Sequence, residues 1–185
     1  KYVYDRGLTR KTCLTIDTDA GPRILELHLQ DGLVNSVTVD MGAVEVSPSV
    51  ALEAAGETFT VVPASAGNPH GVIFCPDPDQ IDLERLGPLL ETHPALGERR
   101  NIEFAACPDR EHLVLRVWER GSGITLACGT GACAVFGAAL AGELCESKVE
   151  ARLPGGALTL EKRGEAVLMT GPARTVFEGE VKILP

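Results

Sequence analysis

The sequence predicts an α+β protein in which short strands dominate and helices are few. Glycine (20 residues) and proline (12) are plentiful among the 185 residues, while aromatic residues make up only 4%. Apolar runs are short and bounded by such turn residues. The chain also shows a weak internal repeat, since Gly7 and Gly142 stand 135 residues apart. Gly21 and Gly156 share that offset, so we expect two similar lobes of mixed or antiparallel sheet.

The predicted elements follow the apolar runs. Strands are expected over residues 14–18, 24–29, 34–40, 58–63, 72–75, 102–106, 113–119, 148–153, 157–161 and 167–170. Helices are expected over 83–91 and 131–141, and the second ends at Gly142, which is typical of a C-terminal glycine stop. Residues 1–6, before Gly7, have the pattern of the last turns of a third helix.

The composition excludes several classes of protein. The formal net charge is −9 and the isoelectric point is about 4.9, which argues against a nucleic-acid partner because phosphate binding needs a clustered cationic surface. No apolar run reaches the roughly 18 residues of a membrane span, and nothing at the start resembles a signal peptide. We therefore expect a cytoplasmic protein with no membrane partner.

The cysteines do not form a metal motif. They stand at positions 13, 75, 107, 128, 133 and 145. No C-x-x-C pair occurs and the four histidines fall at no zinc-finger spacing, so no metal is expected. The even count leaves disulfides open, but reduced thiols are favoured without a secretory signal. Among the six, only Cys128 has surroundings that would activate a thiol.

Cys128 stands in a glycine-rich turn, Ala-Cys-Gly-Thr-Gly, at the predicted start of an alanine-rich helix. Backbone N–H groups at a helix start lack internal partners, and the helix dipole favours negative charge there. This position is expected to push the thiol toward thiolate, and the same N–H groups can hold a substrate carboxylate. The alternatives are a buried structural cysteine and a phosphate loop, but the motif of the phosphate loop is absent. The combination suits proton abstraction next to a carboxylate.

Three further motifs offer polar groups at strand ends. Gly-Asn-Pro-His places Asn68 and His70 in a turn, Arg-Arg-Asn-Ile-Glu-Phe places Asn101 at a strand mouth, and Glu119 and Arg120 end another strand. Each motif has a simpler interpretation: a surface turn, a solvated charge cluster or a surface ion pair. The functional interpretation is an amide and an imidazole aimed into a cleft, with a carboxylate and a guanidinium that receive a ligand's ammonium and carboxylate.

Taken together, these motifs resemble the diaminopimelate epimerase family. They occur in that family's order, followed by Gly-Pro-Ala at 171–173 and Val-Phe-Glu-Gly at 176–179, and the resemblance runs from Lys1 to Pro185. It implies a homodimeric isomerase without cofactor or metal, in which two similar lobes each wrap a sheet around a central helix. Phe177 lies in a segment that family members use for dimer contact.

The resemblance also implies a mechanism. Such enzymes interconvert LL- and meso-2,6-diaminopimelate, on the way to lysine and peptidoglycan precursors, with two cysteines that flank the substrate α-carbon. One removes a proton as thiolate and the other returns one as thiol, and Cys128 is expected to be one of the pair. The N–H groups of Gly129 and Thr130 would hold the reacting carboxylate. The remaining roles are distal binding by Asn68, Asn101, Glu119 and Arg120, and adjustment of thiol acidity by His70 and Glu119.

Two departures from the family pattern affect these expectations. The first-half cysteine motif is not in the chain, and the repeat places the counterpart of Cys128 about seven residues before Lys1. We therefore expect an incomplete first lobe and a chain that does not epimerise alone. Arg100 stands where the family usually has threonine, which puts distal binding in doubt.

The expected domain division follows from the same repeat. Residues 1–30 would be a remnant of the N-terminal lobe, to which 174–185 return, and 31–173 would form the C-terminal lobe that carries Cys128. Two alternatives remain: a related racemase that acts on another amino acid such as proline, and a non-catalytic amino-acid-binding or dimerisation remnant. A substrate with one carboxylate would give Arg120 and Asn101 nothing to hold.

Overall fold

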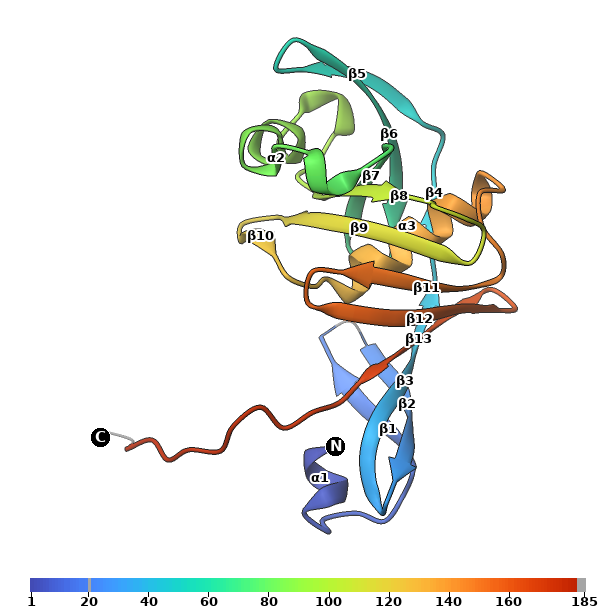
Figure 1. Cartoon of the computed structure of the whole chain (residues 1–185), viewed down its shortest axis with the longest axis vertical. Coiled ribbons are helices and arrows are strands. Elements are labelled where there is room, and N and C mark those ends of the chain that lie inside the picture. The colour runs from blue at the N-terminus through green and yellow to red at the C-terminus, as the bar shows by residue number, and fades with distance from the viewer. Residues whose placement is uncertain (20, 183–185) are drawn as a thin grey trace.

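The computed structural model describes residues 1–19 and 21–182, which form one long, strongly twisted sheet with a buried helix (Figure 1). The strands are β1 (Cys13–Thr18), β2 (Gly21–Gln30), β3 (Leu33–Ala43), β4 (Glu45–Val46), β5 (Val50–Ala54), β6 (Glu57–Ser65), β7 (Pro69–Phe74), β8 (Asn101–Ala106), β9 (His112–Glu119), β10 (Gly123–Thr125), β11 (Lys148–Leu153), β12 (Gly156–Arg163) and β13 (Ala166–Pro172). The helices are α1 (Tyr2–Asp5), α2 (Leu83–Glu91) and α3 (Gly129–Ala141), with 3-10 turns η1 (Pro78–Gln80) and η2 (Pro94–Leu96).

The sheet is mixed, as predicted. Its strands follow the order β1-β2-β3-β13-β12-β11-β9-β8-β7-β6-β4, and β10 and β5 pair with β9 and β6. Within the described residues, the parallel pairs are β7 with β8 and β9 with β11, and the other pairs are antiparallel. All ten predicted strands are present. The helix predicted over 83–91 has those bounds, and α3 begins two residues earlier than predicted, at Gly129.

The internal repeat is confirmed by the hairpin register. β1 and β11 lie 135 residues apart at both ends, and β2 and β12 begin at the same offset. Leu25 pairs with Val39 in the first unit, and Leu160, 135 residues after Leu25, pairs with Met169 in the second. Val39 and Met169 then pair with each other where β3 meets β13. The two units are therefore related by a local two-fold axis that passes between these residues.

Helix α3 is the centre of the main core. Its sequence is apolar on every side, which is typical of a helix enclosed by protein. Ala132 to Phe136 are almost fully buried, and they pack against residues from β7, β8, β9, β11, β12 and β13. Small residues let the strands approach closely: a Cβ at Gly137 would lie 2.5 Å from Val44. Adding even one methyl group there would force the core apart.

Three short strands were not predicted. β5 has the sequence Val-Ala-Leu-Glu-Ala, whose alanine and glutamate do not favour a strand. It forms because Ala55 and Gly56 both have positive φ, +53° and +78°, which suits a tight hairpin to β6. Leu52 and Ala54 are then buried on one face. β4 and β10 are only two and three residues long, too short for a periodic signal.

The smaller part of the molecule contains α1, β1, β2 and the near end of β3 (Figure 1). The predicted division at residue 31 falls between β2 and β3, which pair with each other. β3 continues along β13 into the larger part, so this strand joins the two. Within the described residues, 173–182 form no helix or strand, and the side chains of Arg6 and Glu178 form an ion pair. The predicted return of 174–185 includes residues 183–185, which lie outside the described residues.

Candidate active site

Cys128 lies at the start of α3, as predicted. It is the N-cap residue of the helix, with extended backbone angles (φ −140°, ψ 108°). Its Sγ accepts a hydrogen bond from the backbone N–H of Gly131 at 3.4 Å and lies 3.5 Å from the hydroxyl of Thr130. A side chain that accepts at this point satisfies one of the donors that every helix leaves unpaired. The residue is 7% exposed, so the sulfur is held rather than solvated.

The expected shift of this thiol toward thiolate is wrong in the ligand-free structure. Burial raises the pKa of Cys128, and this outweighs the lowering by the Thr130 hydroxyl and the Gly131 N–H. The carboxyl groups of Glu103 and Glu119 raise the pKa further, because negative charge nearby disfavours a thiolate. The resting form of Cys128 is therefore the thiol.

Asn101 connects this thiol to the neighbouring strand end. Its amide nitrogen lies 3.8 Å from the Cys128 Sγ, as a donor, and its amide oxygen accepts from the backbone N–H of Arg120 at 2.9 Å. Sheet register produces this position, since β8 runs parallel to β7 and antiparallel to β9. Asn101 thus lies beside His70 in β7, and both polar groups of its amide are engaged within the protein.

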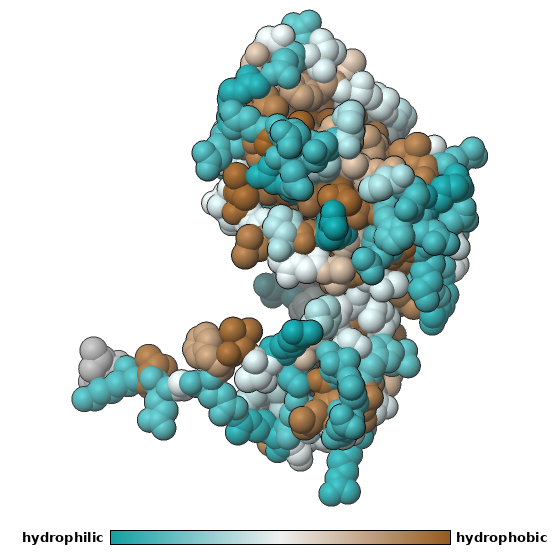
Figure 2. Space-filling model, viewed as in Figure 1, coloured by the Kyte–Doolittle hydropathy of each residue, from teal (hydrophilic) through white to brown (hydrophobic). Residues whose placement is uncertain are grey.

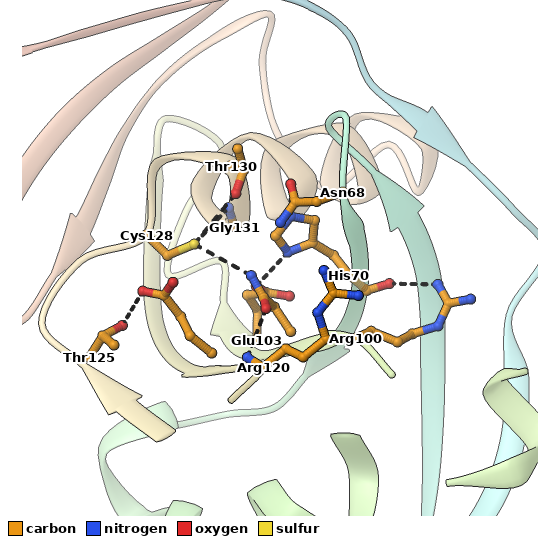
Figure 3. A network of polar contacts seen from close by, with 11 residues as sticks. Asn68, His70, Arg100, Glu103, Arg120, Thr125, Cys128, Thr130 and Gly131 are labelled. Carbon is orange, nitrogen blue, oxygen red and sulfur yellow. Dashed lines mark hydrogen bonds and ion pairs between the residues drawn. The ribbon is translucent and has the colours of Figure 1, made fainter. Parts of the chain in front are cut away.

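His70 is fully buried and lies between two polar side chains (Figure 3). Its Nδ1 is 2.7 Å from Glu103 Oε1, and its Nε2 is 3.1 Å from Asn68 Oδ1. The figure shows this group directly below the first turn of α3, close to Cys128 and Thr130. The structure therefore brings Asn68, His70 and Cys128 into one network, although they come from separate motifs.

Glu103 is the residue of this network that the sequence analysis missed. It lies in the middle of β8, all six residues of which are buried, and its side chain is 0% exposed. Burial raises the pKa of its carboxyl group, although the adjacent His70 lowers it. The available signal was a charged residue inside an apolar strand, between Ile102 and Phe104, because such a residue is rarely buried without a specific partner.

Glu119 and Arg120 lie at the end of β9, as predicted, but differ in exposure. Glu119 is partly buried and accepts a hydrogen bond from the Thr125 hydroxyl at 2.6 Å. Arg120 is exposed, and its Nη1 donates to the backbone carbonyl of Arg99 at 3.2 Å. A guanidinium held only by one carbonyl can still turn toward an anionic ligand.

Arg100 is turned toward the protein backbone. Its Nη2 donates to the carbonyl of Leu96 at 2.8 Å, and its Nη1 donates to the carbonyl of His70 at 3.2 Å. The side chain therefore braces the strand that carries His70. Phe177 lies in the C-terminal stretch, beside Tyr2 and Arg6 of the smaller part, and is 84% exposed. Gly129 and Thr130 supply backbone N–H groups in the first turn of α3.

The comparison with known proteins decides the family. Residues 62–176 match the family model of diaminopimelate epimerase, a span that includes every motif around Cys128. The diaminopimelate epimerase of Phocaeicola vulgatus is 45% identical over 198 aligned residues, which cover 99% of this chain and 70% of the relative. The chain belongs to the diaminopimelate epimerase family. The family member from Acetivibrio thermocellus is 43% identical and is covered over 71% of its length. The proteins of this family are isomerases.

Solved structures share the fold at low sequence identity. A protein described as a probable proline racemase from Agrobacterium radiobacter, solved with bound carbonate, superposes with a TM-score of 0.76 at 14% identity over 99% of this chain. A hydroxyproline epimerase from Agrobacterium vitis gives a TM-score of 0.66 at 18% identity over 92%. The chain spans 65% and 60% of the length of these two proteins. They establish the architecture expected of the diaminopimelate epimerase family.

Two searches of the described residues gave no candidates. Residues 1–19 and 21–182 hold no cluster of three or more histidine, cysteine or acidic side chains placed to bind a metal ion. Over the same residues, every helix is too short or too polar to cross a membrane.

Proposed function

We propose that Cys128 is one of two acid–base groups that epimerise LL-2,6-diaminopimelate to its meso form without a cofactor. The observation that carries this proposal is the position of its sulfur: it caps α3, beside free first-turn N–H groups and the amide of Asn101. Membership of the diaminopimelate epimerase family supports the same reaction. The second group belongs to a segment outside the 185 residues, since Cys128 is the only cysteine here that is followed by glycine.

The reaction needs a base on one face of the α-carbon and an acid on the other. A thiolate takes the α-proton, and the electron pair of the broken C–H bond moves into the substrate carboxylate. A thiol on the opposite face then gives its proton to the α-carbon, which inverts the centre. Because the resting Cys128 is a thiol, it acts first as the proton donor and becomes the base for the reverse reaction.

The developing negative charge needs donors that are already in place. The N–H groups of Gly129 and Thr130 lie in the first turn of α3, where backbone donors lack partners within the helix. A preorganised donor of this kind contributes on the order of 3 kcal/mol to the transition state. We therefore assign the reacting carboxylate to this turn.

The distal end of the substrate needs a cation and an anion. Arg120 would bind the distal carboxylate, and the partly buried Glu119 would bind the distal ammonium. Asn68 lies beside His70 and would add a further amide contact. Asn101 would serve the site differently from the sequence-based expectation, because its amide already bonds to Arg120 and approaches Cys128.

An exposed apolar face supports the two-lobe division at residues 30 and 31. Ile16 and Leu25 lie on one face of the small β1–β2 hairpin, and Ile16 is 43% exposed. Their counterparts in the repeat, Ala151 and Leu160, are both 0% exposed because they pack beneath α3. We infer that a second helix, equivalent to α3, covers the first face and carries the second acid–base group opposite Cys128.

We also propose a cytoplasmic homodimer. All six cysteines are free, which suits a reducing compartment. Val176 and Phe177 are 88% and 84% exposed in the C-terminal stretch, and a partner subunit would cover this apolar pair.

Calorimetry on the chain joined to its upstream segment tests the substrate assignment. Diaminopimelate should bind, and proline should bind at least tenfold more weakly because it lacks a distal carboxylate for Arg120. Arg120→Gln should weaken diaminopimelate binding about tenfold, while Arg152→Gln, which lies on β11, should leave it unchanged. Equal binding of proline would favour a proline-racemase-like activity instead. Binding of diaminopimelate without any turnover would favour a non-catalytic remnant.

A further inference from the structure

The buried pair of Glu103 and His70 has an arrangement that the proposed reaction does not explain. Glu103 Oε1 is 2.7 Å from His70 Nδ1, and both side chains are 0% exposed. Within the described residues, Glu103 Oε2 is the buried side-chain polar atom that lacks a hydrogen-bond partner. Above it lies the first turn of α3, where a Cβ on Gly131 would be 2.7 Å from Glu103 Oε1. The carboxyl group is therefore enclosed on every side.

The protonation state follows from what each atom contacts. An ionised carboxylate needs donors on both oxygens when it is buried, and Oε2 has none within the described chain. A neutral carboxyl group leaves only a carbonyl oxygen unpaired, which costs less. Burial raises the pKa of Glu103 and thus favours this neutral form, against the lowering by His70.

The other side of His70 gives the same result. The Asn68 atom near Nε2 is the amide oxygen, which only accepts, so Nε2 carries a hydrogen and donates to it. In a neutral imidazole the other nitrogen, Nδ1, is then an acceptor. Its neighbour, Glu103 Oε1, must therefore supply the proton of this short contact.

Three titratable groups face this pair from the elements around it. They are Cys128 before α3, Glu119 at the end of β9, and His70 itself in β7. A carboxylate at position 103 would place a second negative charge beside Cys128, in addition to that of Glu119. A neutral Glu103 avoids this charge and leaves the helix start able to accept an anionic ligand.

We propose that Glu103 is a positioning residue: its protonated carboxyl group donates to His70 Nδ1, fixes His70 as the Nε2–H tautomer, and thereby fixes the amide of Asn68 with its oxygen toward His70. The NH2 group of Asn68 is then the part that donates to a ligand. Asn68 consequently recognises an acceptor, such as a carboxylate oxygen, and disfavours an ammonium group. This last step rests on the proposed function, whereas the tautomer of His70 does not.

The tautomer can be measured directly on the 185-residue chain by nitrogen-15 NMR of the histidine rings. We expect His70 to remain neutral, with its hydrogen on Nε2, throughout the neutral pH range. Glu103→Gln should preserve this tautomer because the glutamine NH2 group also donates to Nδ1. Glu103→Leu should change the tautomer or let His70 titrate, and Glu150→Gln on β11 is the control that changes nothing.

Two results would overturn the proposal: an imidazolium at His70 in the unmodified chain at neutral pH, or a neutral ring with its hydrogen on Nδ1. If Glu103→Leu does not fold, the unmodified chain and Glu103→Gln still decide between these states. An isotope-edited infrared difference spectrum between those two proteins should also contain a protonated carboxyl band, and an ionised carboxylate band would contradict the assignment.

Kinetics on the chain joined to its upstream segment test the consequence for binding. Glu103→Gln should keep KM for diaminopimelate within about twofold, and Asn68→Asp should raise it more than tenfold because it replaces the donor with an acceptor. A Glu103→Gln variant with the KM of Asn68→Asp would overturn the proposed role. If diaminopimelate is not turned over at all, the proposed function fails, but the NMR result for His70 stands on its own.

Discussion

The amide nitrogen of Asn101 lies 3.8 Å from the sulfur of Cys128, while the amide oxygen of the same side chain accepts a hydrogen bond from the backbone of Arg120. One side chain thus joins the thiol at the start of α3 to the residue that ends β9. The thiol and the proposed distal-binding guanidinium are held in a fixed relation, because Asn101 is itself only 6% exposed.

Asn101→Asp should make Cys128 less reactive. The aspartate can still accept from Arg120, but it places a negative charge beside the sulfur and raises the pKa of the thiol. Each unit of that increase lowers the thiolate fraction at neutral pH about tenfold. We expect alkylation of Cys128 by iodoacetamide, followed by mass spectrometry, to slow by about tenfold or more. Asn35→Asp, near the far end of β3, is the control, and equal slowing in both variants would contradict this contact.

The buried cysteines should become reactive in a fixed order as pH rises. Burial raises the pKa of Cys128 above the ordinary value of 9.0, that of Cys145 to about 11 and that of Cys133 to about 12. The thiolate is the reactive form. Site-resolved alkylation should therefore modify Cys128 at a lower pH than Cys145, and Cys133 last. Rapid modification of Cys128 well below neutral pH would show that the helix start outweighs burial.

Gly131→Ala should destabilise the protein and disturb the site together. The new Cβ would lie 2.7 Å from Glu103 Oε1 and 3.2 Å from the Cys128 Sγ, closer than normal contacts. Overpacking of this kind typically costs about 1–3 kcal/mol. Urea denaturation measures the loss, and Gly142→Ala at the other end of α3 is a matched control because its nearest contact is an ordinary 3.4 Å. Similar stability of both variants would show that Glu103 moves freely.

Trp118→Phe should lower stability in a pH-dependent way. Trp118 Nε1 donates to Glu91 Oε2 at 2.7 Å, and Glu91 also binds Arg99. Burial raises the pKa of Glu91, but these hydrogen bonds outweigh it, so the folded pKa lies below the ordinary 4.5. This contribution is present above pH 4.5 and is lost as the pH falls through the folded value.

The expected loss for Trp118→Phe at neutral pH is about 1.5–3 kcal/mol, the value of a hydrogen bond to a charged group. Denaturation followed by circular dichroism should show a smaller difference between the two proteins in acid than at neutral pH. A difference that stays constant with pH would assign the effect to packing of the indole ring instead.

Most of the fold could be predicted from local signals in the sequence. Apolar runs between glycines marked ten strands, and Gly142 marked the end of α3. The offset of 135 residues anticipated the repeat, which the register of Val39 and Met169 now places on a two-fold axis. β5 escaped prediction because its pairing depends on a turn at Ala55 and Gly56, not on its own composition.

The chemistry of the site was harder to predict because it depends on burial. The motif around Cys128 identified the helix start, but the electrostatic argument for a thiolate ignored the cost of removing a charge from water. Glu103 was overlooked because strand residues were judged by periodicity, and its partner His70 is distant in sequence. Their contact exists because β7 and β8 are parallel neighbours, a pairing that no local signal gives.

The most direct measurement follows the α-proton of LL-diaminopimelate by NMR in D₂O. The chain joined to its upstream segment should replace that proton with deuterium and form the meso isomer. Cys128→Ala should abolish both, and the 185-residue chain alone should do neither. Inversion and deuterium incorporation at an enzymatic rate by the chain alone, or by Cys128→Ala, would contradict the assignment of Cys128 as one of two acid–base groups.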